Sequence, residues 1–397
     1  MAKIVWHSTA PWSASGYGTQ TAIWTQKLRD MGHEVFISNF WGLAGGLLEW
    51  HGIPVLPGFG GGYCSPSLSQ HCKHISPDLV ITLGDVRVLD PAVLRELPAA
   101  HWLPADCRSM SAADRQVVEA AGSQLIAMSR FGLDRFRDAG FRDALYVPHG
   151  IPVETFRIPS PEEREQFRAD RGVSPGTYVI GVNAANNDAI RKAAPEMMLA
   201  FAKFLQGHPD SLLALHTGVH QDGGQDLEYL AESLGLTDRV RVVDQYRYAA
   251  GLISSDSMRE WYASLDLLCA ATYAEGFGVP IVESLACGVP VVTTACSSME
   301  ELNPDGYQVD GEPFWNGVHR AWWIRPSTAG ICRAFEQAYE ARGDVNPVKL
   351  RESVAEYDVD VVAREHMGPA IGTLLERMTA RKVAALCPEI SVMHWSR

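Results

Sequence analysis

Short apolar strands alternate with amphipathic helices through both halves of this chain, and this alternation constrains the fold more than any other feature. The first half contains six strand-like segments: Lys3 to His7, Glu34 to Ser38, Leu79 to Leu83, His101 to Leu103, Gln124 to Met128 and Leu145 to Pro148. The second half contains five: Tyr178 to Val182, Leu212 to His216, Val240 to Val243, Leu267 to Ala270 and Pro290 to Thr293. Strands that alternate with helices form parallel sheets covered on both faces. The sequence therefore predicts an α/β protein.

The length of the chain allows two such sheets. With 397 residues, of which 46% are apolar and 20% charged, the chain can bury more than one core. We expect a first Rossmann-like domain at 1–155, a second at 156–369 and a last helical segment at 370–397. No run of 18 apolar residues predicts a transmembrane helix. The start of the chain lacks a signal pattern, and its eight scattered cysteines are typical of reduced thiols, so a cytoplasmic protein is expected.

One segment of the second half, from Tyr273 to Thr294, carries two carboxylates around a glycine-rich turn. It reads YAEGFGVPIVESLACGVPVVTT. Glu275 lies in the turn, and Glu283 follows eight positions later. Gly276 and Gly278 leave the backbone between them free of side-chain carbons, so it can approach a ligand closely.

A short helix is expected directly after this turn. Pro280 suits the first turn of a helix, where its missing N–H is not needed, and Gly288 suits the position just after the last turn. The N–H groups at the start of the helix and the positive end of its dipole then point toward the turn. This arrangement favours a bound phosphate.

The segment from Tyr273 to Thr294 resembles the donor-sugar motif of the retaining glycosyltransferases of family 4, in which two glutamates separated by seven residues flank a glycine-rich turn. The resemblance implies a GT-B fold, with two Rossmann-like domains facing across a cleft and the segment 370–397 packing back onto the first. It also implies that Glu283 binds the ribose hydroxyls and that Glu275 binds a hydroxyl of the transferred sugar. The donor diphosphate would meet the backbone N–H groups of Gly276, Phe277, Gly278 and Val279.

A second candidate site follows the strand that begins at Tyr178. A polar loop there leads to Arg191 and Lys192 and then to a helix. Cations at the start of a helix oppose its dipole, which favours a ligand-binding role. Lys192 stands nine positions before Phe201, as does the lysine that contacts the donor diphosphate in the family. Relatives carry an arginine further upstream, where this chain has asparagines, so either Arg191 replaces it or one charge is missing.

The first half contributes two further candidates. Gly16 and Gly18 lie in the loop after the first strand and resemble the family's glycine-bearing loop beside the donor diphosphate. They do not complete a G-x-G-x-x-G fingerprint, which argues against a dinucleotide cofactor. Asp106 lies where many relatives carry a histidine, and it is either a polar group facing the sugar or acceptor or an ordinary loop residue. Glu275, Lys192 and Asp106 are thus the catalytic candidates.

Neither a metal nor a cofactor beyond the nucleotide sugar is expected. The only D-x-D triplet, Asp358 to Asp360, is better explained as helix-capping residues. Cysteines and histidines cluster only at residues 64–74, which is weak support for a zinc site. Lys192 and the helix start would supply the positive charge that a metal provides elsewhere.

The acceptor is the least constrained part of the prediction. The opening loop and the HGIP sequence at 149–152 resemble glycosyltransferases encoded by bacteriophages, some of which modify hydroxymethylated pyrimidines in DNA. The net charge of −13 is unlike that of most DNA-binding proteins. An arginine cluster at 130–142 either meets phosphates or forms a solvated helix face. A carbohydrate, lipid or small-molecule acceptor, or a nucleotide-sugar epimerase of the same fold, remains the alternative.

Overall fold

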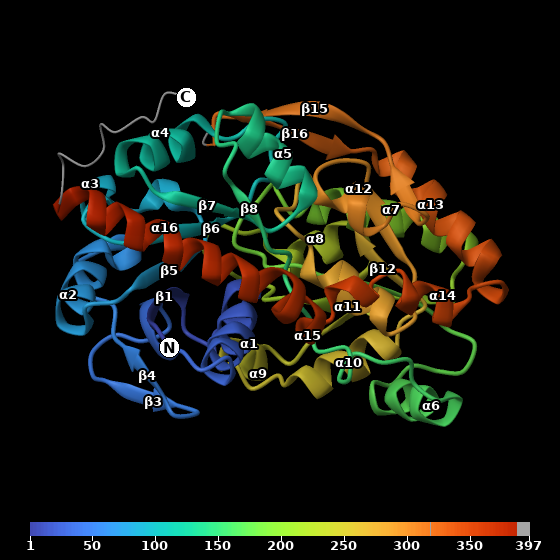
Figure 1. The fold of residues 1–397 in the computed structure, drawn as a ribbon. Helices are drawn as coiled ribbons and strands as arrows, with labels where there is room; N and C mark the ends of the chain where they lie inside the picture. Colours follow the sequence, from blue (N-terminus) through green and yellow to red (C-terminus); the bar gives the residue numbers. More distant parts are fainter. Residues whose placement is uncertain (318, 387–397) are drawn as a thin grey trace.

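Two parallel sheets form the framework of the protein, whose computed structural model describes residues 1–317 and 319–386 (Figure 1). The first sheet has eight strands in the order β3-β4-β2-β1-β5-β6-β7-β8. Its only antiparallel pair is β3 with β4. The strands are β1 (Lys3–Thr9), β2 (Glu34–Trp41), β3 (Leu48–Trp50), β4 (Ile53–Leu56), β5 (Leu79–Leu83), β6 (Ala99–Leu103), β7 (Gln124–Ala127) and β8 (Leu145–Tyr146).

The second sheet has six parallel strands in the order β11-β10-β9-β12-β13-β14. They are β9 (Tyr178–Asn183), β10 (Ser211–His216), β11 (Val240–Val242), β12 (Leu267–Ala270), β13 (Val291–Thr294) and β14 (Tyr307–Val309). A separate antiparallel hairpin follows, made of β15 (Gly311–Asn316) and β16 (Ala321–Pro326). The predicted α/β class with two parallel-sheet domains is confirmed.

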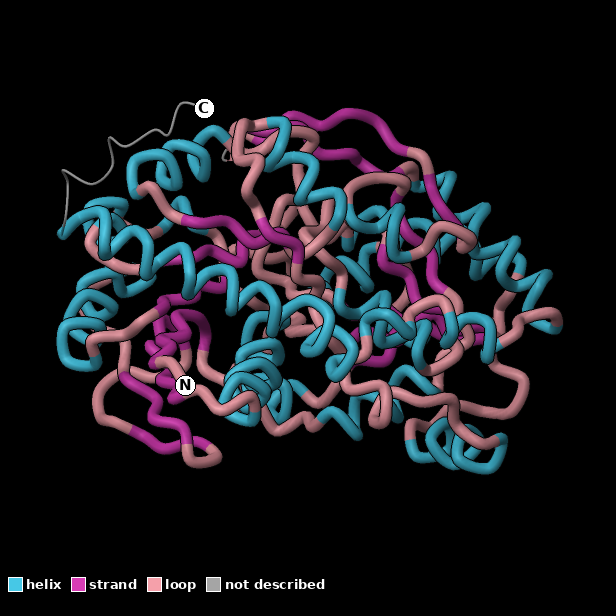
Figure 2. Tube along the Cα trace, viewed as in Figure 1, coloured by secondary structure: helices cyan, strands magenta, loops and turns pink. Residues whose placement is uncertain are grey.

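Helices enclose both sheets, as Figure 2 shows in cyan around the magenta strands. Those of the first domain are α1 (Gly16–Asp30), α2 (Ser65–Ile75), α3 (Pro91–Arg95), α4 (Ala112–Ala121) and α5 (Arg130–Asp138). Those that follow are α6 (Pro161–Asp170), α7 (Ala194–Gly207), α8 (Leu227–Ser233), α9 (Gln245–Ala249), α10 (Ser255–Ala263), α11 (Val279–Ala286), α12 (Ser298–Leu302), α13 (Thr328–Glu340), α14 (Pro347–Glu352), α15 (Val359–Val362) and α16 (Gly368–Leu386).

Local sequence signals explain where several of these elements begin. Ser129 caps α5 by accepting from the N–H of Gly132, and Ser160 forms a reciprocal capping box with Glu163 at the start of α6. Asp358 caps α15 with its side chain, as the D-x-D triplet predicted. Every strand expected from the sequence is present, whereas β3, β4, β14 and the β15–β16 hairpin were not anticipated. No helix in the described ranges is long and apolar enough to cross a membrane.

The long helix α16 returns to the first domain, as the red ribbon of Figure 1 shows. Its Arg377 donates to the side chain of Gln124 at 2.6 Å and to the carbonyl oxygen of Asp143 at 2.9 Å. The apolar face of α16, including Leu374, lies in the core that also contains β1 and β5. Residues 387–397 of the predicted C-terminal segment lie outside the described part of the chain. The division at residue 155 stays a prediction.

The chain therefore passes between the domains twice, and the two passages are bonded to each other. The N–H of Ile151 donates to the carbonyl oxygen of Tyr357, and the N–H of Val359 donates to that of Ile151, both at 2.9 Å. Ile151 and Asp358 form a parallel bridge. Close by, the side chain of Gln20 donates to the carbonyl oxygen of Gly150 at 3.0 Å.

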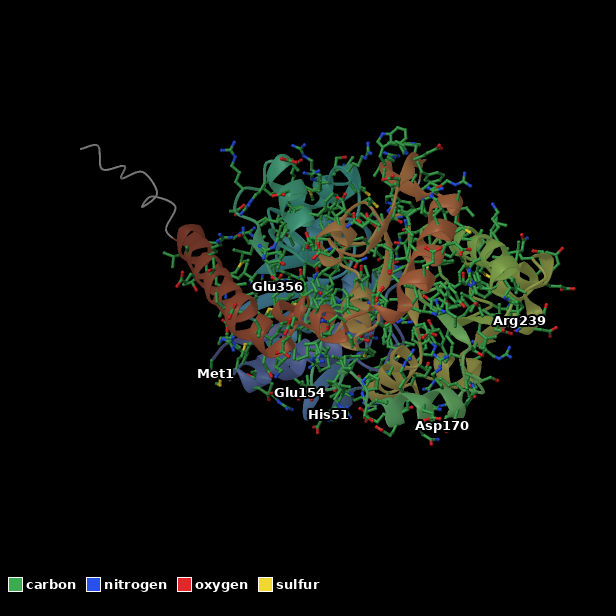
Figure 3. The ribbon with its side chains drawn as sticks, turned by 90° about the vertical axis from the view of Figure 1, so that its right-hand side faces the viewer. Met1, His51, Glu154, Asp170, Arg239 and Glu356 are labelled. Atoms are coloured by element: carbon green, nitrogen blue, oxygen red, sulfur yellow. The ribbon has the colours of Figure 1, made fainter. Side chains whose placement is uncertain are left out.

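A carboxylate of the second domain caps a helix of the first. Glu301, on α12, accepts hydrogen bonds from the backbone N–H groups of Arg130 (3.0 Å) and Phe131 (2.9 Å) at the start of α5. Arg130 also pairs with Glu356 at 3.3 Å, and Figure 3 labels Glu356 on the surface beside the C-terminal helix. A negative charge at a helix start is stabilised by the helix dipole, so Glu301 ties the two domains together.

Replacing Glu301 by glutamine is expected to lower the melting temperature by roughly 2–4 °C, because the amide keeps one oxygen acceptor and loses the charge. Scanning calorimetry measures the effect, with Glu300→Gln on the same helix as the control, since Glu300 is exposed. An unchanged melting temperature in Glu301→Gln would show that the contact contributes nothing to domain association.

Candidate functional site

Two cations and one carboxylate meet at the carboxyl edge of the second sheet. The Nζ of Lys192 lies 2.7 Å from Oε1 of Glu275, and a guanidinium nitrogen of Arg191 lies 3.3 Å from Oε2. The side chains of Lys192 and Glu275 are each only 15% exposed. Burial by itself raises the pKa of Glu275, but the two cations outweigh it and lower the pKa below its ordinary value. Burial and the charge of Arg191 lower the pKa of Lys192, whereas its bond to Glu275 raises it. With two basic side chains around one carboxylate, the group carries a net positive charge when Lys192 is protonated.

Serine side chains fix the loop that carries Glu275. The hydroxyl of Ser297 accepts from the N–H of Glu275 at 3.1 Å. The hydroxyl of Ser298 lies 2.9 Å from the carbonyl oxygen of Glu275 and 2.6 Å from that of Phe277. These bonds hold the loop between β12 and α11 in one conformation, so Glu275 is presented on a rigid support.

The glycines of this loop serve the contact between the domains as well as the turn. A Cβ at Gly276 would lie 2.5 Å from the Cβ of Pro104, which belongs to the first domain. Gly278 has a φ of +110° and begins α11 without a side-chain cap. Close approach of the backbone was expected at a ligand, but at Gly276 the close neighbour is the other domain.

The side chain of Phe277 is buried between the domains, and the prediction for this residue concerns its backbone N–H. It is 2% exposed and packs against the rings of His149 and Tyr357, with centroid distances of 5.3 and 5.4 Å. Its backbone N–H and those of its neighbours, including Val279, remain the groups to which the donor-binding prediction applies. Because α11 starts without a side-chain acceptor, these N–H groups have no cap at their end of the helix.

Glu283 lies in a different environment from Glu275, on the buried face of α11. It is 7% exposed, and burial raises its pKa to about 7. Its Oε2 accepts a hydrogen bond from the hydroxyl of Tyr262 at 2.8 Å, which acts to lower the pKa. The structure thus connects Glu275 directly to Lys192 and Arg191, whereas Glu283 belongs to a separate hydrogen-bonded network.

The first domain contributes Asp106 and Tyr17 to the same region. The negative charge of Asp106 acts to raise the pKa values of both Arg191 and Lys192 in the second domain. The pKa of Tyr17 is raised well above its ordinary value, first by burial and then by the charge of Asp85. Asp106 also accepts a hydrogen bond from the thiol of Cys107 at 3.0 Å. The predicted catalytic candidates are therefore close enough to influence one another across the domain contact.

The loop that holds Gly16 and Gly18 is shaped by local packing. Ser15 caps α1 by accepting from the N–H of Gly18 at 3.0 Å. A Cβ at Gly18 would collide with the carbonyl oxygen of Ser13, whereas one at Gly16 would have open space around it. Gly18 is thus required by the fold of the loop itself. Tyr17, between the two glycines, faces the charges of Asp85 and Arg191.

The β15–β16 hairpin of the second domain reaches the first domain beside Asp106 and lies at the top of Figure 1. The indole N–H of Trp323 donates to the sulfur of Cys107 at 3.2 Å, and the N–H of Arg108 donates to the carbonyl oxygen of Trp322 at 3.3 Å. The pKa of His319, near the tip of the hairpin, is lowered by burial and by the charge of Arg87, while the charge of Asp106 acts to raise it. The hairpin therefore covers the region around Asp106 where the two domains meet.

Four residues of this region were not found from the sequence: Tyr17, Arg87, Tyr262 and His319. Arg87 pairs with Asp85 at 3.0 Å and with Asp114 at 3.3 Å. Tyr17 lies between the two glycines of the predicted loop, whereas the other three lie in no motif, so only their positions in space connect them with the site. Within the described part of the chain, no cluster of three or more His, Cys, Asp or Glu side chains is arranged to hold a metal ion.

Solved structures identify the class of fold. The chain has the GT-B fold of glycosyltransferases, and 95% of it aligns with sucrose-phosphate synthase from Thermosynechococcus elongatus, covering 100% of that chain, with a TM-score of 0.75 and 16% identity. Anabaena Alr3699/HepE in complex with UDP and glucose aligns with 94% of this chain and 100% of its own, with a TM-score of 0.69 and 19% identity.

The sequence comparisons point to the same class in the second domain. Residues 185–320 match the family model described as glycosyl transferases group 1. D-inositol 3-phosphate glycosyltransferase of Corynebacterium jeikeium is 32% identical over 174 residues, 42% of this chain and 39% of the relative. Lipopolysaccharide core biosynthesis mannosyltransferase LpsB of Rhizobium meliloti is 26% identical over 168 residues, 42% of this chain and 44% of the relative. These matches span about two fifths of the relatives' length.

Proposed function

We propose that the protein is a retaining glycosyltransferase that moves a sugar from a nucleoside-diphosphate sugar to a hydroxyl acceptor. The observation that carries the proposal is the group formed by Glu275, Lys192 and Arg191 at the start of α11, within the segment that matches the glycosyltransferase family model. A net positive, largely buried group beside a helix N-terminus suits a diphosphate.

Each residue then has a defined role. Lys192, Arg191 and the first N–H groups of α11 stabilise the negative charge that develops on the diphosphate as it leaves. Glu275 accepts a hydrogen bond from a hydroxyl of the sugar. Glu283 accepts hydrogen bonds from the ribose hydroxyls, since a carboxylate can accept several at once. The bond between C1 of the sugar and the diphosphate oxygen breaks, a bond from C1 to the acceptor oxygen forms on the same face, and the proton of the acceptor hydroxyl passes to the leaving diphosphate oxygen.

UDP- and GDP-sugars are the proposed donors, and a hydroxyl of a small carbohydrate or cyclitol is the first acceptor to test. One neighbour of the same fold was solved with UDP and glucose, and the names of the curated relatives mention inositol phosphate and lipopolysaccharide. Hydroxymethylated DNA remains a further acceptor to test. Several basic side chains of the arginine cluster at 130–142 and of α16 are already paired with acids and so are less available to DNA phosphates. The pairs are Arg130 with Glu356, Arg135 with Asp138, Arg377 with Asp143 and Lys382 with Asp78.

A donor screen tests the proposal. The protein is incubated with UDP-, GDP- and ADP-sugars, and free nucleoside diphosphate and the released sugar are measured. Slow hydrolysis of one donor, accelerated by an acceptor, is the expected result. An isomerised sugar nucleotide would instead identify an epimerase, and the absence of binding or turnover with every donor would refute the proposal.

The acceptor arm of the screen uses the donor found in this way. The protein is incubated with each candidate acceptor, and the mass of the product is measured by mass spectrometry. The candidates are cyclitols, their phosphates, short saccharides and DNA containing 5-hydroxymethylcytosine or 5-hydroxymethyluracil. A hexose-sized gain in one class identifies the acceptor. If DNA is that class, activity should fall steeply as salt rises, because phosphate contacts release counterions.

Activity is expected to survive removal of divalent metal. Lys192 and Arg191 already supply positive charge beside the proposed diphosphate position, so the leaving group does not need a cation. Turnover is measured after dialysis against EDTA, with and without added magnesium or manganese. Loss of turnover in EDTA that either metal restores would contradict this prediction.

A further inference from the structure

A chain of buried and partly buried hydrogen bonds connects Glu283 to the carboxyl ends of two strands of the second sheet. The hydroxyl of Tyr262, on α10, donates to Oε2 of Glu283 at 2.8 Å. The side-chain amide of Asn183, at the end of β9, donates to the same hydroxyl at 2.7 Å. Nδ1 of His216, at the end of β10, lies 3.3 Å from Oδ1 of Asn183. Tyr262 is fully buried, and Glu283 is 7% exposed.

The chemistry of these groups fixes the direction of every bond. When Glu283 is ionised its carboxylate only accepts, so the hydroxyl of Tyr262 donates a hydrogen bond to it. The oxygen of Tyr262 must then accept from the NH2 group of Asn183, which turns Oδ1 of Asn183 toward His216. Burial lowers the pKa of His216 to about 4, so its ring is neutral. Because Nδ1 faces the amide oxygen of Asn183, which only accepts, the proton is assigned to Nδ1. Each member orients the next, and the chain ends at Glu283.

We propose that Tyr262 is a positioning residue of the nucleoside site: its hydroxyl, oriented by Asn183, holds one oxygen of Glu283 and leaves the remaining acceptor sites of the carboxylate for the ribose hydroxyls. The inference rests on the proposed function, since it requires that Glu283 bind the ribose.

The tyrosine ring and its hydroxyl have separable roles. The ring packs against Phe156 and Trp261, with centroid distances of 6.1 and 5.1 Å, and phenylalanine would keep these contacts. The hydroxyl contributes the bonds to Glu283 and Asn183. Tyr262→Phe therefore removes the positioning bond with little change in packing.

The test measures nucleotide binding, because the donor sugar is not needed for it. UDP, GDP and ADP are titrated into the wild-type protein by calorimetry, and the tightest of them is compared with its 2′-deoxy form. Tyr262→Phe is expected to weaken the ribonucleotide about tenfold, the loss of one hydrogen bond to a charged group. The preference for ribose over deoxyribose should shrink in the same variant, because a carboxylate that is not held in place no longer fits both hydroxyls.

The pH dependence supplies a second readout. Tyr262 on α10 bonds to Glu283, and His216 on β10 is connected to it through Asn183. Cys287, the residue just after α11, interacts with the charge of Glu283 and with those of Arg259, Arg351 and Arg157. Burial raises the pKa of Cys287 to about 12, so it stays neutral, and the guanidinium groups stay charged. Glu283, with a pKa of about 7, is therefore the group of this set that titrates near neutrality.

Glu283 binds ribose as the carboxylate, so nucleotide affinity should fall as the pH drops through about 7. The bond from Tyr262 lowers the pKa of Glu283, and its removal raises that pKa further. The fall in affinity should therefore begin at a higher pH in Tyr262→Phe than in the wild type. A role limited to stability would not move this midpoint.

Further variants separate positioning from folding defects. Tyr178→Phe is the control, since Tyr178 is a buried tyrosine at the opposite end of β9 from Asn183. Asn183→Leu removes the bond that orients the hydroxyl and should weaken binding in the same direction, which keeps the test valid if Tyr262→Phe folds poorly. In a Glu283→Gln background, Tyr262→Phe should add little further loss, because residues that act through one group are not additive.

The outcomes distinguish the inference from the proposed function. Binding that weakens in Glu283→Gln but not in Tyr262→Phe, with an unchanged pH midpoint, overturns the role of Tyr262 and leaves the proposed function intact. Full additivity in the double variant also overturns it. Wild-type binding in Glu283→Gln removes the ribose role of Glu283 and the inference with it. If the wild type binds none of the three nucleotides, the proposed function itself fails.

Discussion

Lys192→Ala is expected to reduce turnover of the donor by roughly 10²–10³-fold, the largest single effect in the site. Its ammonium group lies in a largely buried position 2.7 Å from Glu275, where charge interactions are weakly screened. As the diphosphate leaves, negative charge builds where this cation can stabilise it. The loss should appear mainly in kcat, because Arg191 and the start of α11 still hold the bound nucleotide.

Steady-state kinetics with the donor from the screen measures this effect. Lys203→Ala is the matched control, since Lys203 lies on the exposed face of α7, the helix that follows Lys192. Turnover within threefold of wild type in Lys192→Ala would remove Lys192 from the proposed mechanism. A similar loss in Lys203→Ala would point to a general effect of net charge.

Glu275→Gln is expected to lower turnover about ten- to a hundredfold while nucleoside diphosphate binding stays equal or becomes tighter. The amide cannot accept the sugar hydroxyl as a carboxylate does, which slows transfer. It also leaves Arg191 and Lys192 without their counter-charge, so the site becomes more positive toward the diphosphate. Opposite changes in kcat and in affinity are specific to this arrangement.

The same variant should be less stable without nucleotide. In this variant Arg191 and Lys192 lose the carboxylate that they share. An unpaired buried charge lowers the free energy of unfolding. The melting temperature of Glu275→Gln should therefore fall by a few degrees and recover when nucleotide binds. Glu232→Gln, at an exposed position on α8, is the control. Nucleotide binding that weakens together with turnover would contradict the charge argument.

The framework and the motif could be predicted from the sequence because both depend on local patterns. Buried strands such as β5, with every residue inaccessible, leave a continuous apolar run in the sequence. The α11 segment combines a turn, a proline in the first helical turn and a glycine after the last, and each of these signals is local. Glu275 and Lys192 are therefore predicted from the sequence, and the structure brings their side chains within 2.7 Å of each other.

Contacts between residues that are far apart in the sequence could not be predicted in this way. Tyr262 reaches Glu283 only because α10 packs beside α11, and no spacing rule connects the two. The hairpin was missed because β15 and β16 pair with each other and cover another surface, so their tryptophans do not follow the pattern of a buried strand. Gly276 shows a further limit. The sequence predicts that another group comes close to its backbone, but it does not predict that this group is Pro104 of the first domain.

The paired passages of the chain between the domains restrict how the two domains can move relative to each other. Segments near Ile151 and Asp358 run side by side and are hydrogen-bonded, so they act as two parallel straps rather than as a single tether. Two straps can bend together about the axis that crosses both, but twisting one domain against the other would pull them apart. Any relative motion of the two domains is therefore expected to be a bend about that axis rather than a twist.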